Sequence, residues 1–122
     1  MARCILAKMF NVEERDVVFM DSRLKNKVIA RRFYNYYLWR YKKVKHHHMK
    51  NYIKGIHHAS SIYHCTLMEK EVEIYKEIRK QFITFMWYAD QSEWEKMKID
   101  RAYSIEDLHD IDFKKLYIDI IN

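Results

Sequence analysis

The chain has 122 residues, 49% hydrophobic and 33% charged, a length that suits one buried core and is short for two. One glycine, Gly55, and no proline exclude a Gly-x-x-x-x-Gly-Lys phosphate loop and a Gly-x-Gly-x-x-Gly dinucleotide motif, and they argue against a turn-rich β-sandwich. The two cysteines, Cys4 and Cys65, form no Cys-x-x-Cys pair, so we expect no disulfide framework, no thiolate zinc site and a reducing cytoplasm.

The net charge of +6 is unevenly distributed along the chain. Residues 1–89 hold 18 Lys or Arg against 8 Asp or Glu, whereas residues 90–122 hold 5 against 9. Residues 22–68 contain eleven basic side chains and no carboxylate. Like charges on one surface repel each other, so this segment predicts a polyanionic partner. A membrane partner is not expected, because the segment has no basic face opposite an apolar one and the chain lacks about 20 consecutive apolar residues.

The first half of the chain carries four helical patterns. Apolar residues at helical spacing predict one short helix over residues 1–10, which Asn11 ends, and a second over residues 12–20. Residues 25–41 predict the long core helix, because apolar positions recur at three and four residues and leave several basic residues to other faces. A weaker pattern over residues 44–54 predicts a further short helix.

The second half begins at Gly55, which suits the left-handed residue that closes a helix and permits a sharp turn. A new helix should begin near residues 59–60, with Ser60 or Ser61 as its cap. The side chains expected to face inward from it are Ile62, Cys65, and Leu67 or Met68. Residues 71–97 predict nearly continuous helix. Its apolar stripe consists of Val72, Tyr75, Ile78, Phe82, Phe85 and Met86.

A last amphipathic helix is predicted near the end of the chain, where residues 104–107 resemble a capping box. Together the patterns predict an all-α fold, a small helical bundle with a C-terminal helical extension. The charge distribution divides it into a basic body over residues 1–90 and an acidic extension over residues 91–122. Residues 104–121 could pack on the body, form a homodimer contact or bind a protein partner.

The order of helix, glycine turn and helix across residues 44–68 is that of a helix-turn-helix. Here the sequence resembles the C-terminal DNA-binding domain of the bacterial replication initiator DnaA, a helical domain related in fold to the Trp repressor. The resemblance covers about residues 5–88 and depends on three stretches. Residues 16–23 resemble a helix end with its Ser-Arg loop, and residues 25–38 resemble a basic loop entering an Ala-Arg helix. Residues 55–64 resemble the signature Gly-Arg-Asp-His-Thr-Thr-Val-Leu-His.

The signature can be aligned in two ways. In one frame Ser60 to His64 match Thr-Thr-Val-Leu-His, and Ala59 stands where the family has its base-reading His. In the other frame Gly55 and His58 match the family's Gly and His, with one residue inserted before Ser61. Both frames replace the Arg-Asp pair, so the resemblance implies DNA binding but not the family's usual DNA box. The family's ATPase module is not expected, which implies a free-standing relative, from a phage or a mobile element.

A helix-turn-helix places the first turn of its second helix in the major groove, where imidazole and hydroxyl groups can reach base edges. The predicted base-reading residues are His57, His58, Ser60, Ser61 and His64. The competing interpretation is helix capping for the serines and a core or solvated position for His64. By resemblance, Arg23, Lys25 and Lys27 would contact a minor groove or the backbone. The further candidates for phosphate contacts are Arg31, Arg32, Lys42, Lys43, Lys45, Lys50 and Lys54.

Three other interpretations carry less weight. The aromatic residues of 34–41 could stack on single-stranded bases, but their helical spacing favours core packing. The histidine run 46–48 has no metal-site spacing and no nearby carboxylate, so we expect no bound metal. We also expect no other cofactor and no enzymatic activity. The main hypothesis is sequence-specific double-stranded DNA binding in replication or transcription control, in a prokaryotic cytoplasm, at the nucleoid or in a phage-infected host. The alternative is a helical protein-interaction module, an inhibitor or adaptor that does not bind DNA.

Overall fold

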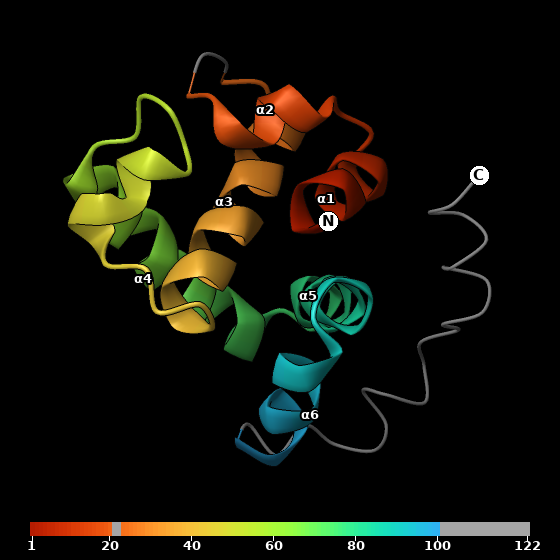
Figure 1. The fold of residues 1–122 in the computed structure, drawn as a ribbon. Coiled ribbons are helices and arrows are strands. Elements are labelled where there is room, and N and C mark those ends of the chain that lie inside the picture. Colours follow the sequence, from red (N-terminus) through yellow and green to blue (C-terminus); the bar gives the residue numbers. More distant parts are fainter. Residues whose placement is uncertain (21–22, 101–122) are drawn as a thin grey trace.

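The computed structural model describes residues 1–20 and 23–100, and helices dominate this part of the chain. Its elements are α1 (Ala2–Phe10), α2 (Glu14–Val18), α3 (Lys25–Arg40), the 3₁₀ helix η1 (His46–Asn51), α4 (His58–Ile74), α5 (Lys76–Ala89) and α6 (Gln91–Asp100) (Figure 1). The described residues form no strand, only one isolated bridge between Phe19 and Lys54. The all-α prediction is therefore confirmed, while the helix expected after residue 104 lies outside the described residues.

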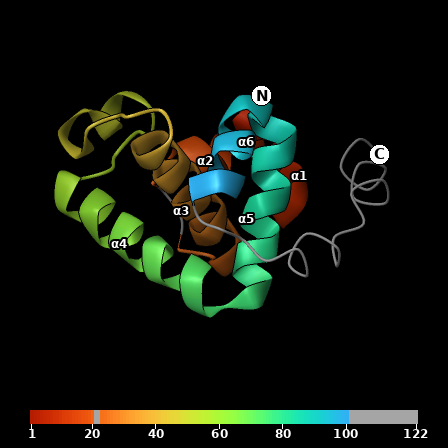
Figure 2. The same cartoon turned by 90° about the horizontal axis from the view of Figure 1, so that it is seen from below.

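Helix α3 is the centre of the molecule, because it packs against α1, α2, η1 and α4. Its second half is buried almost all round, as expected for a helix without a polar stripe. The ring of Phe33 meets that of Phe82 edge-on at 5.6 Å, and Tyr36 meets the same ring at 5.2 Å. The aromatic residues of this helix therefore fill the core, as their spacing predicted. In Figure 2, α4 and α5 diverge from their junction with α3 between them.

Local chemistry explains where the helices end. Asn11 closes α1 at φ 54°, a left-handed conformation that Asn tolerates better than most residues, and this predicted stop is confirmed. The helix predicted almost throughout residues 71–97 is confirmed apart from two interruptions, at Tyr75 and Asp90. Tyr75 is extended and exposed, so it leaves the predicted apolar stripe. Val72 and Phe82, on either side of this break, are both buried.

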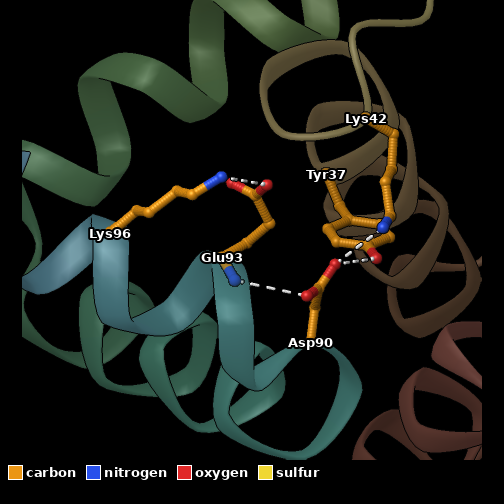
Figure 3. Close-up of polar contacts among 5 residues, drawn as sticks. All are labelled: Tyr37, Lys42, Asp90, Glu93 and Lys96. Atoms are coloured by element: carbon orange, nitrogen blue, oxygen red, sulfur yellow. Dashed lines mark hydrogen bonds and ion pairs between the residues drawn. The ribbon is translucent and has the colours of Figure 1, made fainter.

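The bend between α5 and α6 is tied to α3 through Asp90 (Figure 3). Its Oδ2 accepts a hydrogen bond from the Tyr37 hydroxyl at 2.9 Å and lies 2.9 Å from Lys42 Nζ. Its Oδ1 accepts from the Glu93 N–H at 3.2 Å and so caps α6. Trp94, one residue further on, is buried in the same core. The described beginning of the predicted acidic extension thus packs on the body.

Candidate nucleic-acid interface

The turn before α4 is fixed by backbone hydrogen bonds to the chain that follows α2. Lys54 N–H donates to the Val18 carbonyl at 2.7 Å, and Met20 N–H donates to the Lys54 carbonyl at 3.0 Å. Gly55 follows with φ +86°, a conformation that side chains with a Cβ rarely adopt. Ile53 is fully buried on the other side of this turn. The predicted left-handed glycine is confirmed, and the weak helix before it is a short 3₁₀ helix.

A chain of polar contacts joins η1, α4 and α3. Ser61 Oγ donates to Asn35 Oδ1 at 2.9 Å, and His46 Nδ1 lies 2.7 Å from the same Oγ. Since the hydroxyl proton goes to Asn35, the His46 ring donates through Nδ1. The ring also stacks on Trp39, with centroids 5.3 Å apart. Burial, followed by the nearby charge of His58, lowers the pKa of His46, which favours the neutral ring.

This chain of contacts changes the role of Ser61. Its exposed fraction is 0%, so its hydroxyl does not reach a DNA groove, and the prediction that it reads bases is wrong. It does not cap α4 either, because the helix begins at His58 and its N-cap is His57, whose Nδ1 accepts from the Ala59 N–H at 3.3 Å. Ser61 instead positions α4 against α3 and η1.

His64 also faces the molecule rather than solvent. Its Nδ1 accepts a hydrogen bond from Arg32 Nε at 3.2 Å, and Arg32 in turn lies 3.7 Å from the Glu71 carboxylate. Burial lowers the pKa of His64, and the charges of Arg32 and Arg31 lower it further. A half-buried neutral imidazole beside two guanidinium groups is poorly placed to read a base. His64 is therefore not among the base-reading residues, and its ring contacts Arg32 on α3 instead.

The outward face of the first turns of α4 combines imidazole, hydroxyl and apolar groups. His57 and His58 are exposed with ring centroids 4.6 Å apart, and Ser60 is half-buried. The prediction that Ile62 faces inward is wrong, and Tyr63 was not predicted to contribute: their exposed fractions are 46% and 62%. The sequence signal that Ile62 and Tyr63 face outward is the buried stripe of α4, whose members are four, three and four residues apart. It consists of Ser61, Cys65, Met68 and Val72 and leaves positions 62 and 63 outside.

Several predicted phosphate-contacting residues form ion pairs or hydrogen bonds within the protein instead. Lys27 lies 3.2 Å from Asp16, and Lys42 is bound to Asp90 as described above. Arg31 is only 5% exposed and donates to the carbonyls of Asp16 at 3.3 Å and Phe19 at 2.7 Å. These three residues and Arg32 therefore support the fold. The expectation that residues 22–68 need an external polyanion is too strong, because carboxylates from both flanks already neutralise part of their charge.

The remaining cations point to solvent. Arg23, Lys25, Lys43, Lys45, Lys50 and Lys54 are exposed, and none of them forms an ion pair with a described residue. Four of the six lie on η1 or its flanking loops, and η1 contacts α4. The Lys54 ammonium lies 5.5 Å from the centre of the Phe19 ring. An exposed cationic surface consequently borders the start of α4.

Histidines add to the same surface. The rings of His47 and His48 lie 4.1 Å apart. The charge of His48 is the first cause that lowers the pKa of His47, followed by burial and the charges of Lys45 and His58. The start of η1 and the start of α4 therefore influence each other electrostatically. Within residues 1–20 and 23–100, no group of three or more His, Cys, Asp or Glu side chains is arranged to hold a metal ion.

Comparison with protein-family models, with curated proteins and with solved structures finds no match for the chain. The resemblance to the DNA-binding domain of DnaA therefore stays a prediction. Among the described helices, none is both long and apolar enough to cross a lipid bilayer.

Proposed function

We propose that the protein binds double-stranded DNA, with the start of α4 in the major groove. The observation that carries the proposal is the group of exposed lysines on η1, which contacts α4, and on its flanking loops, none of which is paired with a described carboxylate. Such side chains supply phosphate contacts, which fix the register of a protein on a duplex without reading its sequence. The set of phosphate contacts is Lys43, Lys45, Lys50 and Lys54 beside α4, with Arg23 and Lys25 at the start of α3.

Sequence readout would come from the exposed side chains of the first two turns of α4. His57, His58 and Ser60 offer hydrogen-bond donors and acceptors to base edges, as predicted from the sequence. Ile62 and Tyr63 add apolar contact area, which favours the C5-methyl group of thymine in the major groove. The contacts of Ser61 with Asn35 and His46 support the proposal, because a reading helix needs a fixed orientation.

The resemblance to the DnaA domain extends the proposal to replication or transcription control in a prokaryotic cytoplasm, at the nucleoid or in a phage-infected host. The alternative of a protein-interaction module has one observation in its favour. Ile62, Tyr63, Ile74 and Tyr75 are large, apolar and exposed along α4 and its end. A helical groove or sheet edge of a protein could cover them. DNA binding is preferred because cations, and no described carboxylates, border the start of the same helix.

A pair of matched double variants tests the proposal. Lys45→Gln with Lys50→Gln removes two cations beside α4, whereas Lys8→Gln with Lys70→Gln removes two exposed cations elsewhere. In fluorescence anisotropy with a labelled duplex, the first variant should weaken binding and lower the salt slope by about one per lysine, and the second should change neither. Equal effects of the two variants would indicate unspecific attraction and contradict the proposal.

The reading surface needs a separate variant. His58→Ala removes an exposed imidazole without removing a lysine or arginine. We expect it to reduce the preference between duplexes of different sequence while leaving the salt slope unchanged, because base contacts carry specificity and phosphate contacts carry the salt dependence. A uniform loss of affinity for all duplexes would contradict the assignment of His58.

A further inference from the structure

A pocket of about 440 Å³ lies beneath the proposed reading helix. Its walls come from four places in the sequence: the chain after α2, helix α3, the turn at Gly55 and the second turn of α4. The polar groups of the walls are Arg23, Arg31, Arg32, Asn35 and His64. Three arginines thus face one space, and no described carboxylate lines it. Its size lies within the range of about 300–1,000 Å³ that small-molecule sites occupy.

One wall of this pocket holds a donor without a partner. Asn35 is 1% exposed, and its Oδ1 accepts from Ser61 Oγ and, at 3.6 Å, from Cys65 Sγ. Its Nδ2 is buried and has no hydrogen-bond partner among the described residues. Leaving a buried amide donor unpaired costs free energy, so such a group in a native fold calls for an acceptor. Water does not reach this atom, so an occupant of the pocket does not reach it either, and the donors open to an occupant are those of the arginines.

The arginines are held in place before any ligand arrives. Arg31 is fixed by the carbonyls of Asp16 and Phe19, and Arg32 is oriented by His64 through its Nε. Arg23 is exposed at the mouth. Guanidinium groups present forks of N–H donors that match the oxygens of a phosphate, and fixing them beforehand lowers the entropy lost on binding. Burial and the two neighbouring arginines lower the pKa of His64, which favours the neutral imidazole whose Nδ1 accepts from Arg32.

We infer that this pocket binds a phosphate group, with Arg23 and Arg32 as its donors and Arg31 as a further positive charge in its wall. The site shares Arg23 with the proposed DNA surface but none of its lysines, and it can exist whether or not the protein binds DNA. Apolar wall residues, Met20, Val28 and Ile56, leave room for the body of a phosphomonoester. Since Gly55 and Ile56 form the turn before α4, an occupant would contact both that turn and α4.

Phosphate and deoxyadenosine monophosphate are the probes for the test, each added to the full chain without DNA. Nitrogen–proton NMR should show saturable shifts of the Arg32 Nε–H and the His64 ring, beyond those caused by sodium chloride at equal ionic strength. Arg23→Gln should weaken binding about tenfold or more, because a charged hydrogen bond is lost from a site whose other donors remain. Lys50→Gln is the matched control, with the same charge change on an exposed residue outside the pocket.

The outcomes separate cleanly. Saturable shifts that Arg23→Gln weakens and Lys50→Gln does not would support the proposed phosphate site. Because the Arg23 side chain is exposed, its replacement should leave the fold intact. Shifts that sodium chloride reproduces, or that both variants weaken equally, would contradict the proposed phosphate site. A labelled duplex then identifies the source of the phosphate: competition with deoxyadenosine monophosphate points to a DNA backbone phosphate, and simultaneous binding points to a free phosphomonoester. If the protein does not bind DNA, the result with phosphate alone still stands, so each of the two proposals can be contradicted without the other.

Discussion

At the scale of single residues, Ser61 shows how one hydroxyl can fix the orientation of a helix. Its Oγ donates to Asn35 on α3 and accepts from His46 on η1, and water does not reach it. Each of these groups is buried or half-buried, so each depends on the others for its hydrogen bonds. Removing the hydroxyl leaves an acceptor on Asn35 and a donor on His46 without their partner. The cost then includes the desolvation of both groups.

Ser61→Ala should therefore lower the free energy of unfolding by about 1–3 kcal/mol. Urea unfolding followed by circular dichroism at neutral pH measures the change. Ser60→Ala is the matched control, because the neighbouring serine is half-buried and has no hydrogen bond among the side-chain contacts of the described residues, so its effect should stay within about 0.5 kcal/mol. Equal effects at the two positions would contradict the role assigned to Ser61.

The two cysteines differ in burial, as the two neighbouring serines do. Cys4 is exposed on α1, whereas Cys65 is buried on α4 and burial raises its pKa to about 12. Thiolates, not thiols, react with disulfide reagents, so Cys65 should be inert in the folded protein. Titration with Ellman's reagent at pH 8 should modify one thiol per chain in buffer and two in denaturant. Rapid reaction of both thiols in buffer would contradict the packing of α4 on α3.

At the scale of elements, the joint between α3, α5 and α6 depends on one carboxylate. Burial alone would raise the pKa of Asp90, but hydrogen bonds from Lys42, Tyr37 and the Glu93 N–H outweigh it and lower the pKa. A lowered pKa in the folded state means that this carboxylate stabilises the fold above the unfolded value of about 3.9. That contribution is lost as the pH falls through the lower folded value.

Asp90→Asn should consequently destabilise the protein most at neutral pH, by about 1.5–3 kcal/mol for bonds to a charged group. The difference from the original protein should shrink as the pH falls through the lowered folded pKa of Asp90, where the original carboxylate becomes protonated as well. Urea unfolding at several pH values measures it. Glu77→Gln, at an exposed position of α5, is the control and should show little change at any pH. A penalty for Asp90→Asn that is independent of pH would contradict the ionic character of the joint.

The elements themselves were the most predictable part of the structure. Apolar spacing located α1 and α3 to within a few residues, and Asn11 and Gly55 marked the end of α1 and the turn before α4, because helical periodicity and positive φ are local properties. The break at Tyr75 was not predictable, since no glycine or proline marks it. The inward positions of Ser61 and His64 were not predictable either, because their partners Asn35 and Arg32 lie about thirty residues away in sequence.

At the scale of the whole molecule, folding redistributes the charge that the sequence separates. The basic segment has no acidic residue of its own, yet Asp16, Glu69, Glu71 and Asp90 reach it from both flanks. These pairs satisfy cations on α3 and at its end. They leave a smaller set of exposed cations, mostly around η1 and the start of α4. The sequence thus predicted a basic segment correctly but not which of its side chains remain available to a partner.

Salt dependence tests this smaller set most directly. Six exposed cations, Arg23, Lys25, Lys43, Lys45, Lys50 and Lys54, are available for phosphate contacts. If all six contact phosphates, affinity for a duplex should fall by about 10³ between 50 and 200 mM salt. Fluorescence anisotropy with two labelled duplexes, one with a DnaA-type box and one scrambled, measures this fall and any preference for the box. Tight binding with this salt dependence is the predicted result, and absence of binding at 50 mM salt would contradict the proposal that the protein binds DNA.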